Sequence, residues 1–406
     1  MNAKSDYKTC GADRHLSFYI LLFFIVSVLP SHGQIDSTGK GLVSPVDTVS
    51  QKLTGQIDAT GKVLKNQIDT TGRELQGQKP PGRYLSLFEE EDLLEVSLRF
   101  DVSKFVKKAE RDQSIDGIMT MHFSQTDSLE SKVTLKYRGQ SRFERCRYPP
   151  TRITFKKPLY EVPDSGRIKK MKLVNQCQQG SVYGDYVIRE YLVYKLYNVL
   201  TDTSFRARLI SLNFIDSENK RKAITQYGIL IEPEGLLEHR LNMLEVRTKA
   251  LSMRHMYPHM IDRIAIFNYM VSNWDWSVAG QHNISVFTSL NPELAGLGIP
   301  VPFDFDLTGV VNADYAIPPP GLGIETNRDR MFLGICRERE AYQSELMAFL
   351  EKKEEFYSIV TNFPYLSKAE KRDIIVFLDQ FFDQLEKPRS FDKMIDYFLG
   401  NCKDFQ

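Results

Sequence analysis

Four oxygen-bearing side chains in the second half of the chain could hold a cation and activate a hydroxyl group. Asp275 and Asn283 follow a predicted helix, and Asp304 and Asp306 follow a short apolar run. The segments ISVFTS and IPVPF are predicted strands joined by a loop at residues 290–298, so a hairpin would bring Asn283 beside Asp304. Hard oxygen donors of this kind suit Mg²⁺ that is shared with phosphates. Asp275 would lie nearby as a candidate base.

Each of these residues also has a purely structural interpretation. Asp275, between two tryptophans, could end a helix, Asn283 could cap a strand edge, and Asp304 could be a buried acid bonded to backbone amides. Their combination favours a metal or phosphate site, because the order Asp, Asn, strand, strand, Asp is used in kinase-type phosphoryl transfer. His282 is expected to pack against these residues or to orient them.

The elements that must position these residues change in character along the chain. From about residue 94 to 232, seven short β-branched and aromatic runs predict strands, and one helix interrupts them near residues 186–200. Helical patterns predominate afterwards. The sequence therefore predicts an α+β protein with a β-rich part at residues 84–235 and an α-rich part at residues 236–406.

Several short motifs resemble those of the spore coat protein H (CotH) kinase family. They are YRGQSR, RITFKK, IKKMKLVN, a long helix that contains Arg189 and Glu190, and the segments NWD, HN and DFD, spanning about residues 94–316. The resemblance implies a two-lobed protein-kinase-like fold, with a β-rich N-lobe that carries one long helix and an α-rich C-lobe. It also implies transfer of the γ-phosphate of ATP, with Mg²⁺ or Mn²⁺, to a hydroxyl of a protein substrate.

The same resemblance gives roles to the four oxygen-bearing residues. It makes Asp275 the catalytic aspartate, Asn283 a metal-binding asparagine, Asp304 the principal metal-binding aspartate and Asp306 a second carboxylate for the metal. The spacing between Asp275 and Asn283 is wider than in ordinary protein kinases, and this puts their cooperation on one metal in doubt.

The resemblance also predicts contacts to the nucleotide. Lys170 or Lys172 would touch the α- and β-phosphates, and Glu190 would hold that lysine in an ion pair. Because side chains alternate along a strand, both lysines share one face, and the sequence does not choose between them. Glu232 falls at the expected hinge, and Arg138 lies in the segment that replaces a glycine-rich phosphate loop.

Two groups of arginines could either neutralise phosphate charge or form solvated basic faces. In the first group we assign a nucleotide contact only to Arg138, which precedes a glycine that permits close backbone approach. The second group follows the DFD segment, where a substrate-binding segment would lie. The members are Arg138, Arg142, Arg145 and Arg147 in the first group, and Arg328, Arg330 and Arg337 in the second.

The N-terminus has the pattern of a signal peptide at residues 1–33. Basic residues precede an apolar run from Leu16 to Leu29, and small residues follow, so cleavage would leave Gln34 first. The alternative, a permanent anchor, needs about 20 apolar residues. We therefore expect an exported protein, periplasmic or extracellular, with no transmembrane span after cleavage.

Four consecutive eleven-residue repeats occupy residues 34–77, within a spacer and linker at residues 34–83. Isoleucine or valine recurs at the second position and leucine at the ninth, which would form one apolar stripe on a helix. Glycines within the repeats disfavour a helix. The segment is interpreted either as a weak amphipathic spacer that self-associates or as plain disorder.

Four cysteines would remain after cleavage, an even number that suits an oxidising compartment. We expect Cys146 to pair with Cys177 and Cys336 with Cys402, since each pair lies in one half of the chain. Four buried free thiols are the alternative.

The composition restricts the partners and leaves the type of activity open. The 53 lysines and arginines against 52 acids give no basic excess, so nucleic acid is not an expected partner. ATP is scarce outside the cytoplasm, so two other functions remain possible. One is a catalytically inactive binding module with a kinase-like fold, and the other is a metal-dependent hydrolase or transferase.

Overall fold

The computed structural model describes residues 86–139, 141–162, 166–248, 251–292 and 296–403. The chain divides into two units, Met1–Gly77 and Gln78–Gln406. The predicted signal peptide and the repeats lie outside the described residues. Everything below concerns the second unit.

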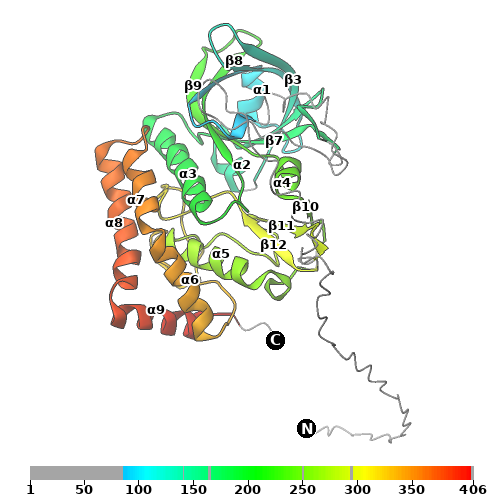
Figure 1. The fold of residues 1–406 in the computed structure, drawn as a ribbon. Coiled ribbons are helices and arrows are strands. Elements are labelled where there is room, and N and C mark those ends of the chain that lie inside the picture. The colour runs from blue at the N-terminus through cyan, green and yellow to red at the C-terminus, as the bar shows by residue number, and fades with distance from the viewer. Residues whose placement is uncertain (1–85, 140, 163–165, 249–250, 293–295, 404–406) are drawn as a thin grey trace, which may run out of the picture. The chain divides into compact units, whose positions relative to one another are not determined.

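Seven strands form a closed barrel, shown in the upper part of Figure 1. Each strand pairs antiparallel with its neighbours except where β1 lies parallel to β8 and closes the barrel, with Leu94 opposite Ile210. In order around the barrel the strands are β1 (Leu94–Phe100), β2 (Ile115–His122), β3 (Ser128–Tyr137), β4 (Thr151–Phe155), β7 (Lys170–Asn175), β9 (Ile224–Ile231) and β8 (Ala207–Asp216).

Alternating side chains fill the inside of the barrel. In β1, Val96, Leu98 and Phe100 are buried, while the residues between them are more exposed, as the two-residue period of a strand requires. The ring of Phe100 packs edge-on against those of Phe105 and Phe214. The interior is therefore a packed core.

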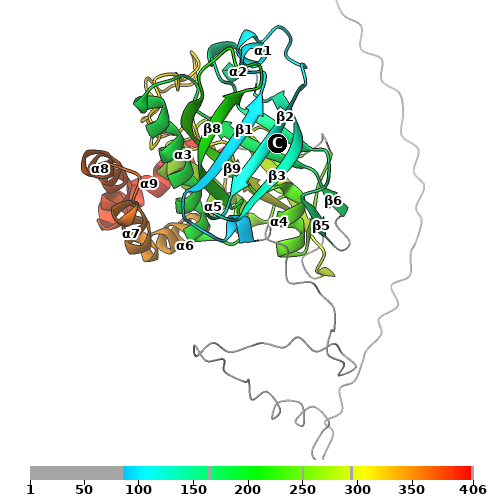
Figure 2. The same cartoon turned by 90° about the horizontal axis from the view of Figure 1, so that it is seen from above.

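The rest of the unit combines a small sheet with helices, the longest of which lies against the barrel. The 20-residue helix α3 (Ser181–Leu200) packs against β8 and β9 on one side and against α7 on the other, which explains why residues are buried around most of its circumference. Figure 2 gives the view from above. The remaining helices are α1 (Val102–Lys107), α2 (Ser141–Arg145), α4 (Glu234–Leu241), α5 (Pro258–Met270), α6 (Arg339–Glu351), α7 (Lys353–Asn362), α8 (Lys368–Leu385) and α9 (Pro388–Asn401).

The short elements complete the fold. The strands β10 (Met243–Glu245), β11 (Ile284–Ser289) and β12 (Gly298–Pro302) form the three-stranded sheet, and β5 (Tyr160–Val162) pairs with β6 (Gly166–Ile168). Two 3₁₀ turns, η1 (Ser86–Phe88) and η2 (Met253–His255), precede β1 and α5. Among the described residues, no helix is long and apolar enough to cross a membrane.

The predicted two-lobed protein-kinase-like arrangement was wrong. The seven predicted runs do form strands, but these strands close into a mixed barrel, which is not the sheet of a kinase lobe. Alternation of apolar residues shows which face of a strand is buried, not which strands are neighbours. The β1–β8 pair that closes the barrel joins segments far apart in the chain and has no local sequence signal.

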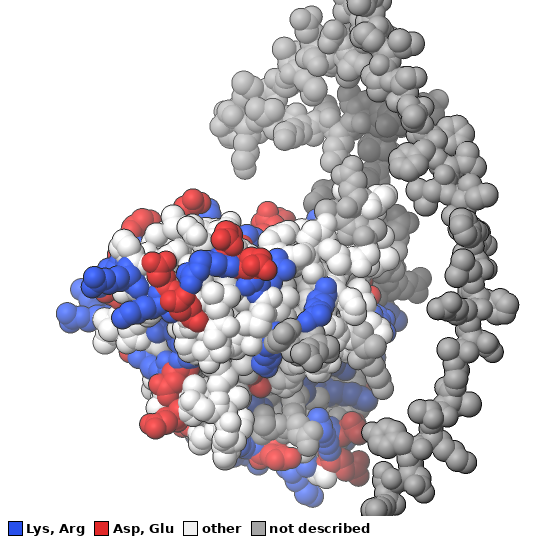
Figure 3. All heavy atoms as spheres, turned by 90° about the horizontal axis from the view of Figure 1, so that it is seen from below, with Lys and Arg blue, Asp and Glu red and all other residues white. Residues whose placement is uncertain are grey.

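Both predicted disulfides are present. Cys146 is bonded to Cys177, and Cys336 to Cys402. The first bond ties the residue after α2 to the chain between β7 and α3, and the second ties the segment before α6 to the chain after α9. Figure 3 shows that lysines and arginines mix with acids on the face seen from below, in keeping with the near-zero net charge.

Candidate functional site

The predicted hairpin between Asn283 and Asp304 is formed by β11 and β12. Ile284 lies opposite Pro302, and the backbone N–H of Phe303 donates to the carbonyl of Asn283 at 3.0 Å. The two polar residues thus lie side by side, as the hairpin predicts. Both have left-handed backbones, with φ of 54° at Asn283 and 62° at Asp304. This conformation is uncommon outside glycine and is often found at functional sites.

Asp275 is held by Asn283 and His282. The side-chain amide of Asn283 donates to the Asp275 carbonyl at 2.8 Å and to Oδ2 at 3.0 Å, and His282 Nε2 lies 2.9 Å from Oδ1. The hydrogen bond to Asp275 raises the pKa of His282, and burial opposes this rise. His282 therefore orients the candidate base, one of the two roles expected for it.

Asp304 and Asp306 share one arginine, Arg142 of α2. Its guanidinium forms an ion pair with Asp304, and its Nε lies 3.3 Å from Oδ2 of Asp306. Burial raises the pKa of Asp304, but Arg142 and Arg138 outweigh burial and hold it below its usual range. Burial also raises the pKa of Asp306, to about 7, which Arg142 lowers only in part because Asp304 and Asp275 add negative charge.

Glu190 of α3 adds a second buried acid, beside Asp306, to this group. Its side chain is 1% exposed, and its Oε1 has no hydrogen-bond partner among the described residues. Burial raises the pKa of Glu190 well above its usual value, and the charges of Asp306 and Asp304 add to the rise, although Arg142 opposes it. Arg142 thus lies among three acids, of which Asp306 and Glu190 are buried and Asp304 is partly buried.

Among the described residues, neither lysine of β7 forms the predicted ion pair with Glu190. Lys172 Nζ instead lies 2.5 Å from Glu234 Oε1 at the start of α4, and 4.0 Å from the centre of the Phe303 ring. Burial lowers the pKa of Lys172, and the nearby charge of Arg138 lowers it further, while Glu234 raises it. Lys170 is exposed.

Arg138 lies at the edge of the same group, after the end of β3. Its Nη1 is buried without a hydrogen-bond partner among the described residues, and its charge lowers the pKa values of Lys172 and Asp304 after larger contributions from burial. An unpartnered buried donor carries a free-energy cost unless an anion or water binds it. This atom therefore favours a phosphate-binding role for Arg138.

Two predictions concern residues that lie outside this group. Both carboxylate oxygens of Glu232 accept hydrogen bonds from Arg240, at 3.0 and 2.9 Å, so its side chain joins β9 to α4. The arginines of the 321–339 segment bind protein groups: Arg328 pairs with Asp373, Arg330 donates to the Phe377 carbonyl, and Arg337 donates to Asp262.

Three contributors were not assigned to the site from the sequence. Arg142 was visible only as one member of a group of arginines, and Glu234 was given no role. Tyr194 of α3 accepts a hydrogen bond from the backbone N–H of Asp304 at 2.8 Å. These roles depend on contacts between the barrel, α3 and the small sheet, which local patterns do not encode.

No group of three or more histidines, cysteines or acids that could hold a metal ion occurs in the part of the chain that the structure describes. No model of a known protein family matches the sequence, and no curated protein is significantly similar to it. The resemblance to the CotH kinases therefore stays a prediction, and the function must be argued from the geometry.

Proposed function

We propose that this chain binds ATP together with Mg²⁺ beside β12 and transfers the γ-phosphate to a hydroxyl of a protein. The observation that carries the proposal is the convergence of two kinds of group around Asp304. Carboxylates and an amide come from the small sheet, and cationic side chains come from β3, α2 and β7. The acids suit a metal, and the cations suit a polyphosphate.

The donor set fits a divalent cation that is shared with phosphates. Magnesium is commonly bound by one or two carboxylates together with substrate phosphates and water, and Asp304 and Asp306 supply two carboxylates. The amide nitrogen of Asn283 is used on Asp275, so its Oδ1 is the atom that could serve a cation. A cation at Asp304 would compete with the Arg142 ion pair. When bound, Mg²⁺ would neutralise charge on the transferred phosphate.

The cationic groups would bind the phosphates. The unpartnered Nη1 of Arg138 is available to an oxyanion, and Lys172 is held between Glu234 and the Phe303 ring. Arg142, released in part from Asp304, would lie between phosphate and the remaining acids. These residues bind and orient the nucleotide.

Asp275 would accept the proton of the acceptor hydroxyl. Asn283 and His282 fix the orientation of its carboxylate through one hydrogen bond to each oxygen, and each oxygen keeps a further lone pair for the hydroxyl. The backbone of His282 is itself fixed by two hydrogen bonds to Ser277, both of 2.9 Å. The base is thus preorganised.

The test compares Asp275→Asn with a matched control, Asp392→Asn, which removes an exposed carboxylate of α9. Transfer of labelled γ-phosphate is measured with the chain itself and a mixture of serine and threonine peptides as acceptors. Asp275→Asn should lower the rate by about 10²–10⁴-fold while nucleotide binding is kept, and the control should retain wild-type activity. Nucleotide binding without transfer in the wild type would contradict the proposal and favour a binding module. Equal rates of phosphate transfer in Asp275→Asn and Asp392→Asn would show that Asp275 does not act as the base.

A further inference from the structure

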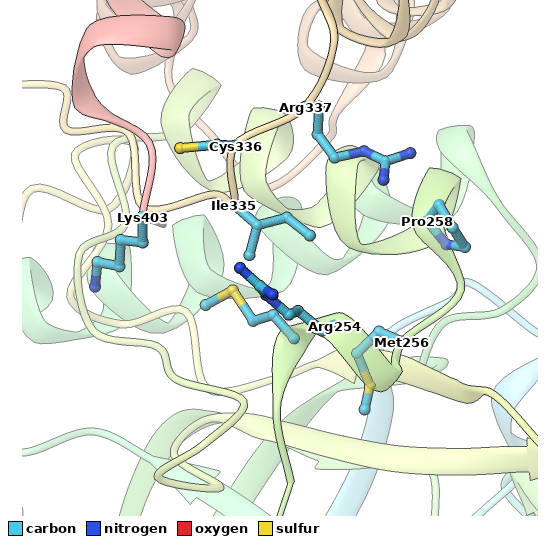
Figure 4. A pocket seen from close by; sticks show the side chains of 8 residues that line it. Arg254, Met256, Pro258, Ile335, Cys336, Arg337 and Lys403 are labelled. Atoms are coloured by element: carbon cyan, nitrogen blue, oxygen red, sulfur yellow. The ribbon is translucent and has the colours of Figure 1, made fainter. Parts of the chain in front are cut away.

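Two cavities outside the proposed phosphoryl-transfer site differ in how their polar side chains are arranged. The cavity in Figure 4, of about 270 Å³, is lined by Arg254, Arg337 and Lys403 among others. Arg337 is bonded to Asp262 at 3.1 Å, and the head groups of Arg337 and Lys403 point away from Arg254, so these three cations do not converge on one point. The second cavity, of about 540 Å³, lies between α3 and α7, and several of its polar side chains keep donors or acceptors.

Four segments line the cavity between α3 and α7. They are one face of α3, the second half of α7, the three residues that follow α7, and residues 91 and 92 shortly before β1. Lys195 of α3 forms an ion pair with Glu91 at 2.5 Å, and the backbone N–H of Leu93 donates to the Tyr365 hydroxyl at 3.1 Å. These contacts join the segments to each other. The cavity is therefore largely preformed, and its volume lies within the range of roughly 300–1,000 Å³ that is usual for small-molecule sites.

One wall of this cavity contains a hydroxyl group without a partner. Tyr191 of α3 is only 2% exposed and lines the cavity, and its hydroxyl forms no hydrogen bond within the described part of the chain. Burial raises the pKa of Tyr191, and the charge of Glu91 adds to the rise, so the hydroxyl stays protonated and can donate. A buried donor that is left unpaired carries a free-energy cost, which a ligand oxygen in the cavity would remove.

Two further hydroxyls at the cavity can donate to a ligand. Tyr365 accepts the hydrogen bond from the Leu93 backbone and keeps its own hydrogen. Ser358 likewise accepts from the side-chain amide of Asn362 at 3.1 Å and keeps its own hydrogen. Together with Tyr191, three hydroxyl groups from α3, α7 and the residues after α7 thus line the same cavity.

The acceptors come from an amide and a carboxylate. Both amide hydrogens of Asn198 are used, on the Ser204 hydroxyl at 2.8 Å and on the Phe205 carbonyl at 3.1 Å, so its Oδ1 is the atom left for a ligand. Asp92 adds a carboxylate at the exposed side. Among the described lining residues the one cation, Lys195, is already held in an ion pair. The cavity therefore disfavours an anion and suits a ligand that both donates and accepts.

Aromatic and aliphatic side chains supply the apolar part of the surface. The ring of Phe363 lies 5.9 Å from that of Tyr191 and 5.7 Å from that of Tyr365, measured between ring centres. Val199 and Ile359 also line the cavity. A ligand with hydroxyl groups at its edge and C–H groups on its face can use both kinds of surface, because C–H groups pack well on the negative face of an aromatic ring.

We propose that this cavity binds a neutral saccharide of one or two rings. Its hydroxyl oxygens accept hydrogen bonds from Tyr191 and Ser358, and its hydroxyl hydrogens are donated to Asn198 and Asp92. Its C–H face packs on the side of the cavity that contains Phe363. These residues take no part in the proposed phosphoryl transfer, so each proposal can fail without the other.

The test is calorimetric titration of the full chain with glucose, maltose, cellobiose and chitobiose, and with putrescine and inorganic phosphate as charged probes. At least one of the four saccharides should bind one to one, and more tightly than either charged probe. Absence of binding by all four saccharides, or tighter binding of putrescine or phosphate, would overturn the proposal.

Two tyrosines of α3 provide a matched pair of variants. Tyr191→Phe should weaken the saccharide by about tenfold, the effect of losing one buried hydrogen bond, without lowering the melting temperature of the ligand-free chain. Tyr197→Phe is the control: its buried hydroxyl also lacks a partner among the residues that the structure describes, but its ring packs against Phe267 and does not line the cavity. It should leave the affinity unchanged. Wild-type affinity in Tyr191→Phe, or an equal loss in both variants, would also overturn the proposal.

Discussion

Two clusters of charged side chains, one against α8 and one beside β12, differ in their ratio of arginines to acids. Against α8, Asp373 accepts hydrogen bonds from Arg189 at 3.0 Å and from two nitrogens of Arg328 at 2.9 and 2.6 Å. Beside β12, Arg142 pairs with Asp304 and Asp306 and lies, with Arg138 nearby, among these two acids and Glu190. Arg189 also lies 3.7 Å from Glu370, so the first cluster has two arginines for two acids, whereas the second has fewer arginines than acids.

The pKa shifts of the acids follow this difference. Burial raises the pKa of Asp373, but Arg328 and Arg189 outweigh burial and lower it. Burial raises the pKa values of Glu190 and Asp306, and Arg142 does not restore either to its usual range. A cluster with more acids than arginines is stabilised when a cation binds, whereas a cluster with equal numbers of acids and arginines is not. Perturbed groups of this kind gather at functional sites. We therefore interpret the α8 cluster as structural and propose the β12 cluster as the binding site.

The largest expected effect on stability is that of Arg142→Gln. It leaves Asp304 and the buried acids Asp306 and Glu190 without their common arginine, and breaking a buried ion pair costs about 3–5 kcal/mol. The matched change in the other cluster is Arg328→Gln, which removes two hydrogen bonds to Asp373; because the arginine is 30% exposed, the loss should be only about 1–2 kcal/mol. Urea unfolding at pH 8 measures both. If Arg142→Gln lowers the free energy of unfolding no more than Arg328→Gln does, the two clusters do not differ in this way.

The second comparison exchanges one acid in each cluster for its amide. Asp306→Asn should leave the free energy of unfolding at pH 8 unchanged or raise it by about 1 kcal/mol, because the folded state disfavours the ionised acid. Asp373→Asn should lower it by about 1–2 kcal/mol, since a charged acceptor of three hydrogen bonds is lost and partial exposure reduces the effect. Denaturant midpoints of the two variants give the answer. Equal losses would show that both acids are structural.

The smallest effect concerns Asp262, a buried acid with one arginine, Arg337. Burial raises its pKa to about 6, and Arg337 compensates only in part. Since this folded pKa lies above the unfolded value of about 3.9, the folded state binds the proton more tightly. Lowering the pH from 7.5 to 5 should therefore stabilise the wild type relative to Asp262→Asn by about 1 kcal/mol. If the free energy of unfolding changes with pH in the same way in both proteins, the folded state does not bind the proton of Asp262 more tightly, and the prediction is wrong.

Much of the local structure could be predicted from the sequence. The strand runs, the helix at α3, the β11–β12 hairpin and both disulfides are present. Each depends on residue alternation, turn chemistry or cysteine position, all of which can be read locally. The barrel could not be predicted, because the β1–β8 pair that closes it depends on packing between distant segments.

In the candidate site too, local patterns predicted some contacts, and others depend on packing between distant segments. Asn283 beside Asp304 follows from the hairpin, and Asp275 follows from the helix before it. The partner of Lys172 in the structure is Glu234, whereas the resemblance had suggested Glu190. The sequence contains several acids that could pair with that lysine, and only the position of α4 relative to β7 selects one. Arg142 could not be chosen among its neighbouring arginines for the same reason.

The central claim is tested most directly by the melting temperature of the chain with ATP, with Mg²⁺ and with both, in the wild type and in Asp304→Asn. A ligand that binds only the folded state stabilises it by mass action, by about 2.7 kcal/mol at a hundredfold excess over the dissociation constant. The account predicts a rise in melting temperature that needs both ATP and Mg²⁺ and is absent from Asp304→Asn. No rise at millimolar nucleotide, or an equal rise in the variant, would contradict it.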